Sequence, residues 1–387
     1  MVGVSKLLCD THNYGDSLRY AAGSKGQLHG AAIGRGPVIA WNITRTCNLK
    51  CVHCYSDSDA QKYTGELSTL EALQFIDDCA AFKVPVLLFT GGEPLIRPDV
   101  FELVQRAKEK NIRVTFSTNG TLIDRKLAQK IKELDVGYVG ISLDGLGEAN
   151  DRFRGKDGAF NQALAGIRHC RTVDQRVGLR FTINRYNYGD LEKIFELIKQ
   201  EQIPRVCFYH LVYSGRAAQM MQHDVSRAES RAALDLIMAK AIEFGDKCEI
   251  LTVDNHADIV YLYMTQLKQD PQKAEKIWQL MTRNGGNRSG IAFANVDSLG
   301  NVHPDQFTKN HTFGNVRERP FGEIWTDMSI GILAGLKNRQ SLLKGRCSKC
   351  KWLEVCNGNF RARAEAVTGD FWESDPACYL TDEEIGV

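Results

Sequence analysis

The stretch VIAWNITRTCNLKCVHCYS, residues 38–56, joins a run of apolar residues to three cysteines. Residues 38–43 are mostly β-branched, aromatic or small and apolar, a composition typical of a buried strand. Cys47, Cys51 and Cys54 follow at spacings of C-x3-C-x2-C, and no fourth cysteine completes the set. The sequence therefore predicts a strand whose end presents three thiols.

Five further strand-like runs follow, and amphipathic stretches with helical periodicity separate them. Strands that are apolar on both faces, each followed by a helix, are typical of parallel βα units. Right-handed crossovers in sequence order curl such units into a complete or partial barrel. We therefore predict an α/β fold, a partial (β/α)6 TIM-like barrel with a small C-terminal domain. The five further runs are residues 84–90, 113–118, 138–144, 177–184 and 205–212.

The same patterns divide the chain into four predicted segments. Helical periodicity fills most of the region after the barrel, and the glycine-rich stretch RNGGNRSG, residues 283–290, marks its end. A second group of cysteines lies beyond that stretch. The predicted segments are an N-terminal segment (1–35), the barrel (36–225), a helical bridge (226–289) and the C-terminal domain (290–387).

The composition argues against several functional classes. The 387 residues include 49 basic and 47 acidic residues, so the chain has no net field that would attract nucleic acid or an anionic membrane. It contains no apolar segment of signal-peptide or membrane-spanning length. We therefore expect a cytoplasmic protein with neither nucleic-acid nor membrane partners. Its twelve cysteines are then expected to be reduced thiols or metal ligands.

The first three cysteines stand where barrels carry their active sites, at the carboxyl end of a strand. Thiolates are the soft ligands of iron–sulfur clusters, and three of them can hold three corners of a cluster while one iron stays open. Zinc is the competing interpretation, because His53 could complete a tetrahedron. Structural zinc sites, however, are closed and draw on C-x2-C pairs, and His53 lies between two of the ligand cysteines.

A glycine-rich turn, FTGGEPL (residues 89–95), follows the second strand-like run. Gly91 and Gly92 allow the backbone to approach a ligand closely, and Glu93 offers a carboxylate to a cationic group. Such a turn at the mouth of the same barrel suits an amino-acid ligand whose amine contacts the turn and whose amine and carboxylate chelate the open iron. A plain turn after a strand is the alternative.

CNLKCVHCY followed by TGGEP at residues 90–94 resembles the radical S-adenosylmethionine (SAM) enzymes, over roughly residues 36–215. The resemblance implies that Cys47, Cys51 and Cys54 hold a [4Fe-4S] cluster and that SAM supplies the missing ligand. Reductive cleavage of SAM would give a 5'-deoxyadenosyl radical, which the protein orients and shields. The resemblance further implies SAM contacts from Tyr55, Gly91, Gly92, Glu93, Asn119, Ser142, Asp144 and Arg180. A turn-forming role for Asp144 and a structural ion pair for Arg180 remain alternatives.

The second cysteine group forms a closed set of four thiols, with three in CSKCKWLEVC and a distant fourth. It resembles one of the two auxiliary [4Fe-4S] sites of SPASM-type radical SAM enzymes, and a four-cysteine zinc site is the alternative. Phe360 and Asp305 stand where that pattern has further cysteines. The resemblance therefore implies one auxiliary cluster, so that the cofactors are two [4Fe-4S] clusters and SAM. The four expected auxiliary ligands are Cys347, Cys350, Cys356 and Cys378.

Further stretches, among them LVYSGRA (211–217) and GDFWESDPACYLTDEEIGV (369–387), resemble the branch of the family that acts in heme d1 biosynthesis. This resemblance implies removal of propionate side chains from a didecarboxysiroheme-type tetrapyrrole, with electrons from a donor such as a flavodoxin or ferredoxin. An anionic macrocycle needs cations at the barrel mouth. The substrate candidates at the sixth strand end and in nearby loops are His210, Tyr213, Arg152 and Arg216; further loop cations are Arg154, Lys156, Arg283 and Arg288.

Three alternatives to this function remain open. Another decarboxylase of an alternative heme pathway would share the same motifs. A radical SAM peptide maturase usually carries an N-terminal peptide-recognition domain, and residues 1–35 are short for one. A non-catalytic iron–sulfur electron carrier would have no need of TGGEP.

Overall fold

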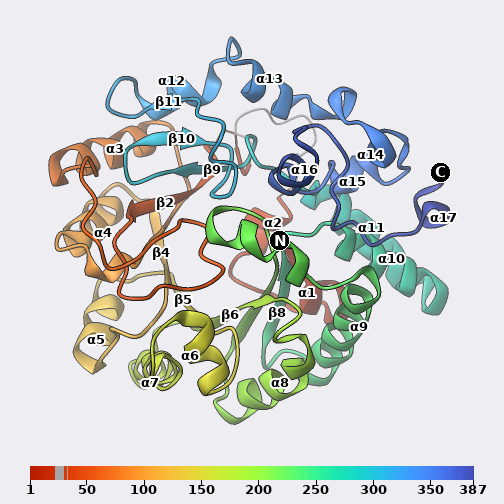
Figure 1. Cartoon of the computed structure of the whole chain (residues 1–387), viewed down its shortest axis with the longest axis horizontal. Helices are drawn as coiled ribbons and strands as arrows, with labels where there is room; N and C mark the ends of the chain where they lie inside the picture. Colours follow the sequence, from red (N-terminus) through yellow and green to blue (C-terminus); the bar gives the residue numbers. More distant parts are fainter. Residues whose placement is uncertain (22–29, 33) are drawn as a thin grey trace.

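A computed structural model describes residues 1–21, 30–32 and 34–387 (Figure 1). Its strands belong to one sheet of eleven strands within these residues, in the order β1-β8-β7-β6-β5-β4-β3-β2-β9-β10-β11. Each neighbouring pair from β2 to β8 is parallel. The strands are β1 (Val2–Gly3), β2 (Val38–Thr44), β3 (Val86–Gly91), β4 (Arg113–Thr118), β5 (Tyr138–Ser142), β6 (Val177–Ile183), β7 (Arg205–His210), β8 (Glu249–Val253), β9 (Phe293–Val296), β10 (Asn301–His303) and β11 (Gly314–Asn315).

The predicted α/β fold is confirmed, and β2 to β7 are its six predicted strands. The described helices are α1 (Val4–Cys9), α2 (Asp16–Arg19), α3 (Thr69–Ala81), α4 (Val100–Glu109), α5 (Arg125–Glu133), α6 (Glu148–Arg154), α7 (Ala159–Thr172), α8 (Leu191–Gln200), α9 (Arg227–Phe244), α10 (Ala257–Gln269), α11 (Pro271–Asn284), α12 (Phe321–Thr326), α13 (Gly331–Lys337), α14 (Gly345–Lys349), α15 (Leu353–Cys356), α16 (Arg361–Thr368) and α17 (Asp382–Ile385). Four 3-10 helices join them: η1 (Pro94–Ile96), η2 (Tyr188–Asp190), η3 (Gly215–His223) and η4 (Arg339–Leu342).

The helices between the parallel strands follow one another around the outside of the sheet, from α3 to α9 (Figure 1). They form where amphipathic periodicity coincides with strong caps. Ser68 and Glu71 make a capping box at the start of α3, and Ser226 and Glu229 make another at the start of α9. Buried side chains of these helices join the core formed by the strands. This packing places the carboxyl ends of β2 to β8 at one mouth.

The predicted helical bridge needs a correction, because it also contains strand β8. This strand adds a seventh parallel strand beside β7 and pairs with β1 on its other side. It escaped the sequence prediction because it is only five residues long and begins with the charged Glu249. Helices α9, α10 and α11 occupy the rest of the bridge, as predicted.

The C-terminal region continues the same sheet. Strand β9 lies parallel to β2, and β10 and β11 follow as antiparallel neighbours. The short helices α12 to α17 complete this region, with α12 packed against α3 and α15 packed against α10 and α11 (Figure 1). The segment 290–387 is therefore joined to the barrel through β9, and its bounds as a domain stay a prediction.

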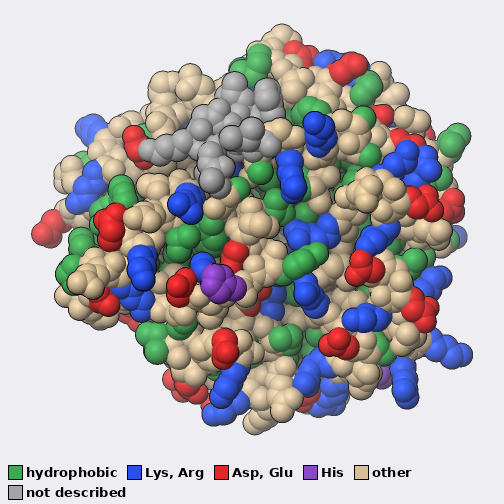
Figure 2. All heavy atoms as spheres, turned by 180° about the vertical axis from the view of Figure 1, so that it is seen from behind, with side chains coloured by type: hydrophobic (Ala, Val, Ile, Leu, Met, Phe, Trp, Pro, Cys, Tyr) green, Lys and Arg blue, Asp and Glu red, His purple; other side chains and the backbone are tan. Residues whose placement is uncertain are grey.

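The distribution of charge on the surface agrees with the nearly equal numbers of acidic and basic residues. On the face opposite to that of Figure 1, acidic and basic side chains are interspersed (Figure 2). None of the helices in the described part of the chain is long and apolar enough to cross a membrane.

Candidate active site

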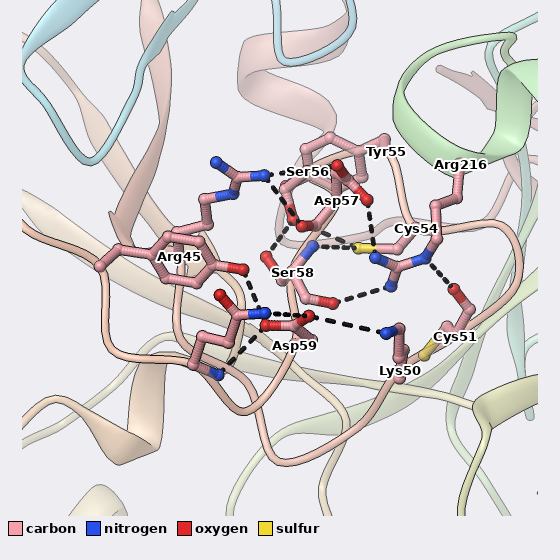
Figure 3. A network of polar contacts seen from close by, with 12 residues as sticks. Arg45, Lys50, Cys51, Cys54, Tyr55, Ser56, Asp57, Ser58, Asp59 and Arg216 are labelled. Atoms are coloured by element: carbon pink, nitrogen blue, oxygen red, sulfur yellow. Dashed lines mark hydrogen bonds and ion pairs between the residues drawn. The ribbon is translucent and has the colours of Figure 1, made fainter.

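The three thiols lie on a loop of residues 45–59, here called the cysteine loop, which follows β2. A hydrogen bond from Cys47 N to Asp59 O (2.8 Å) closes it. Arg216 crosses the loop and donates to the carbonyl oxygens of Cys51 (2.8 Å) and Ser58 (2.7 Å) (Figure 3). It also pairs with Asp57 at 2.8 Å. Arg216 was predicted to contact substrate, but the structure places its guanidinium in the support of this loop.

The sulfur atoms are enclosed and accept hydrogen bonds. Cys47 and Cys51 are each 8% exposed. Burial raises the pKa of the Cys47 thiol to about 12 and also raises the pKa of Cys51. A thiolate at either position therefore needs a positive partner, which a metal centre supplies. The donors to sulfur are Leu49 N to Cys47 (3.4 Å), Ser58 N to Cys54 (3.4 Å), Arg154 Nη1 to Cys51 (3.7 Å) and Asn119 Nδ2 to Cys47 (3.9 Å).

The cluster and zinc interpretations differ in what they require of the three thiols. Zinc would require its thiolates at about 2.3 Å from one centre, whereas a cluster places each thiolate on a different iron. His53, the fourth ligand of the zinc interpretation, pairs instead with Asp144 at 3.2 Å.

The glycines of the TGGEP turn are required by close packing against the cysteine loop and the end of β2. A Cβ at Gly91 would lie 2.1 Å from Thr44 O, and one at Gly92 would lie 2.2 Å from Thr46 O. Gly91 also has a φ of +134°, which L side chains rarely adopt. A hydrogen bond from Gly92 N to Thr44 O (2.7 Å) fixes the contact. The turn therefore joins the ends of β2 and β3.

Glu93 is fully buried behind this turn. Its carboxylate accepts hydrogen bonds from Thr118 Oγ1 (2.7 Å), Asn119 N (2.8 Å) and Leu95 N (3.1 Å). Burial nevertheless raises the pKa of Glu93 to about 7, because these donors are neutral. Among the described residues this carboxylate has no positive partner, as expected for a group that binds an amine. The predicted contact with the SAM amine stays a prediction.

A cavity of about 160 Å³ opens at the carboxyl ends of the parallel strands. Its wall combines the cysteine loop with residues at the ends of β3 to β7. Tyr55 is fixed there by its hydroxyl, which lies 3.2 Å from Thr90 Oγ1. The predicted site residues that line the cavity are Cys47, Cys51, Cys54, Tyr55, Gly91, Gly92, Asn119, Ser142, Arg180 and His210.

Three other predicted residues are engaged elsewhere. The Asp144 carboxylate forms ion pairs with Arg154 and His53, and these pairs hold the pKa of Asp144 at about 2 although burial opposes them. The Tyr213 hydroxyl donates to Asp224 at 2.7 Å. Arg152 has a side chain that is 75% exposed and pairs with Glu148 at 3.6 Å.

Sequence reasoning missed the role of Arg154. It was grouped with loop cations available to a substrate, and it does line the cavity, but it lies at the end of α6, is largely buried, and links Asp144 to Cys51. Its position in the chain carries no signal of this contact, since α6 reaches the cysteine loop only in the folded barrel.

The second cysteine group also converges. All four of its members line one cavity of about 110 Å³. Burial raises the pKa of Cys378 to about 11, and the neighbouring thiols add to the raised pKa of Cys356. Asp305 lies apart from this cavity: its carboxylate caps a turn by accepting from Phe307 N and Thr308 N, both at 2.9 Å. The four are Cys347, Cys350, Cys356 and Cys378.

Comparison with known proteins gives the family. The model of the radical SAM superfamily matches residues 41–198. A protein of Methanosarcina barkeri (strain Fusaro / DSM 804) named Fe-coproporphyrin III synthase is 53% identical, with 100% of this chain and 99% of that protein covered. The chain is a radical SAM enzyme.

A second relative of this radical SAM enzyme is the pre-heme d1 synthase of Dinoroseobacter shibae, which is 43% identical over 92% of this chain and 89% of that protein. The crystal structure of Streptococcus suis SuiB bound to precursor peptide SuiA has a TM-score of 0.70 and covers 90% of this chain and 76% of that chain. Its identity of 15% makes this a likeness of fold alone.

Membership of the family means that the enzyme uses a [4Fe-4S] cluster and SAM. The residues present fit that cluster, since three thiols that line one cavity leave one coordination position for SAM. When bound, the two cofactors supply a 5'-deoxyadenosyl radical. The chain contributes the support of the cysteine loop by Arg216, the contact of Arg154 with Cys51, and a cavity at the strand ends that the three thiols line.

Proposed function

We propose that this radical SAM enzyme removes carboxylated side chains from an iron-containing tetrapyrrole of the didecarboxysiroheme type. The observation that carries the proposal is the 53% identity to an Fe-coproporphyrin III synthase over the whole chain. It favours a product of the Fe-coproporphyrin III type. The heme d1 function expected from the sequence is the second candidate, since the pre-heme d1 synthase is 43% identical.

The cavity has the chemistry that such a substrate needs. Leu211, Val212 and Phe307 give one part of its wall an apolar surface suited to a macrocycle. Arg180 lies over the Tyr209 ring at 4.5 Å, and within the described residues no ion pair with a carboxylate engages it. Its guanidinium is therefore available to a carboxylate, and the methionyl group of SAM is its predicted partner.

We infer from the same cavity wall which residues contact SAM and which support the cysteine loop. Ser142 ends β5 and is paired in register with Arg180, which lies in the middle of β6, and this suits the ribose and the carboxylate of one ligand. Asp144 is better suited to holding Arg154 against Cys51 than to binding ribose, because its carboxylate is already paired. Proposed SAM contacts are Tyr55, Gly91, Gly92, Glu93, Asn119, Ser142 and Arg180.

The four C-terminal cysteines are proposed to hold an auxiliary [4Fe-4S] cluster in a SPASM-like domain. Their convergence on one cavity supports a metal centre, and a four-cysteine zinc site is the alternative. A small electron donor such as a flavodoxin or ferredoxin would supply the reducing equivalents.

Turnover of anaerobically reconstituted enzyme tests the function. Didecarboxysiroheme, SAM and a reductant are expected to give 5'-deoxyadenosine and a product that matches authentic Fe-coproporphyrin III in retention, mass and spectrum. A product that has lost propionates instead would assign the enzyme to heme d1 formation. If a peptide stimulated 5'-deoxyadenosine formation and the tetrapyrrole did not, the enzyme would be assigned to peptide maturation and neither tetrapyrrole function would stand.

A further inference from the structure

His210 is the last residue of β7, and its ring lines the cavity on the same wall as Leu211 and Val212. Its Nε2 lies 3.0 Å from Asp258 Oδ2. Asp258, in α10, is fully buried, and its other oxygen accepts a hydrogen bond from the Tyr379 hydroxyl at 2.7 Å. Because Nε2 is committed to Asp258, Nδ1 is the ring nitrogen left for a ligand in the cavity.

This arrangement is the one that proteins use to present histidine to a metal. A ligating imidazole usually donates its other N–H to a carboxylate, which fixes the tautomer and makes the ring a better donor. With the proton on Nε2 facing Asp258, Nδ1 carries the lone pair. Tyr379 holds the carboxylate in turn, so the ring has a fixed orientation at the cavity wall.

Another histidine of the cavity wall, His53, has a slightly more exposed side chain than His210, 13% against 9%. Its Nε2 also lies near a carboxylate, but its Nδ1 is buried and has no hydrogen-bond partner among the described residues. The ring of His53 packs against Phe153, with 4.6 Å between ring centroids. His210 is therefore the better placed of the two to meet a ligand.

The position of His210 also suits the geometry of the reaction. In the sheet, β7 and β2 are separated by β3, β4, β5 and β6, and His210 lines the same cavity as the three thiols of the cysteine loop. A disc held through its central iron by His210 has its rim, where the side chains are attached, free to face the cysteine loop. Ligation of the iron would hold substrate and product alike, because the iron stays unchanged while a side chain is lost.

We propose that His210 is the axial ligand, through Nδ1, of the iron in the tetrapyrrole substrate, and that Asp258 and Tyr379 hold its ring in place. The inference rests on the proposed function, since it requires an iron-containing tetrapyrrole. It adds a binding role that does not depend on which side chains react.

The test is spectroscopic and needs no turnover. Anaerobic holoenzyme is titrated with ferric coproporphyrin III and, separately, with iron-free coproporphyrin III, and binding is followed by Soret absorption and electron paramagnetic resonance. Wild-type enzyme should give the signature of imidazole-ligated iron. His210→Ala should lose that signature and bind the iron probe at least about tenfold more weakly, and added imidazole should restore the signature. Asp258→Asn should keep the ligand but weaken iron-probe binding by roughly tenfold.

Two controls separate ligation from folding. His210→Ala should bind the iron-free probe as tightly as wild-type enzyme and contain the same iron and sulfide. His311→Ala is the matched substitution, because His311 Nε2 also faces a carboxylate, that of Glu365 at 2.8 Å, but outside the cavity; it should leave all signals unchanged. If His210→Ala gave the same imidazole signature as wild-type enzyme, or if the iron were water-ligated in wild-type enzyme, the inference would be overturned while the proposed function would stand. Failure of wild-type enzyme to bind either probe would overturn the proposed function together with the inference.

Discussion

Replacing Arg216 by alanine should loosen the cysteine loop. The guanidinium donates to Cys51 O at 2.8 Å and Ser58 O at 2.7 Å. Each charged hydrogen bond contributes about 1.5 kcal/mol or more, whereas the pair with Asp57 adds little because the Asp57 side chain is 53% exposed. The loss is therefore roughly 3 kcal/mol, and since 1.4 kcal/mol is tenfold, affinity for iron at the loop should fall by about a hundredfold.

Limited reconstitution makes this loss measurable. At substoichiometric iron and sulfide, Arg216→Ala should lose most of its SAM cleavage. It should also lose the spectroscopic signal of the cluster that changes when SAM binds. Arg152→Ala is the matched control: sequence reasoning gave both arginines the same role, yet Arg152 is exposed and pairs only at 3.6 Å. Its cluster content should equal that of wild-type enzyme. If the two variants retain equal amounts of SAM-responsive cluster, the supporting role of Arg216 is wrong.

Three further predictions concern the clusters and the turn. Alanine at any one of Cys47, Cys51 and Cys54 should abolish SAM cleavage yet leave the iron of the other site, and cleavage by any of the three would contradict the assignment. Alanine at all four of Cys347, Cys350, Cys356 and Cys378 should halve the iron content of the protein, while SAM cleavage without substrate persists. The control variant Asp305→Ala should lose no iron. Zinc in anaerobically purified protein, together with an unchanged iron content in the quadruple variant, would support the zinc alternative. Gly92→Ala brings a Cβ within 2.2 Å of Thr46 O and should cost about 1–3 kcal/mol, seen as weaker SAM binding in equilibrium dialysis. Gly189→Ala, where a Cβ meets nothing within 4 Å, should bind SAM normally, and equal binding by both variants would contradict the packing argument.

The features that the sequence predicted are those carried by local patterns. The strand 38–43 and the cysteines behind it are adjacent in the chain, so periodicity and spacing were enough to place them. The Asp258 partner of His210 could not be predicted, because 48 residues separate the two and only the packing of α10 beside the barrel brings them together. Arg216 and Arg152 look alike as loop cations, and only the fold shows that one spans the cysteine loop while the other faces solvent.

Strand β8 is an element that the local sequence pattern did not reveal. Its five residues lie between two long helices, and a short apolar run does not by itself distinguish a strand from the end of a helix. Its pairing with β7 on one side and β1 on the other decides the conformation.

The most direct measurement of the central claim follows hydrogen from the substrate to SAM. Didecarboxysiroheme deuterated in its carboxylated side chains is incubated anaerobically with reconstituted enzyme, SAM and a reductant, and the 5'-deoxyadenosine formed is analysed by mass spectrometry. If the enzyme abstracts hydrogen from these side chains, deuterium will appear in 5'-deoxyadenosine together with a tetrapyrrole of lower mass. Unlabelled 5'-deoxyadenosine, formed at the same rate with and without the tetrapyrrole, would contradict the proposed function.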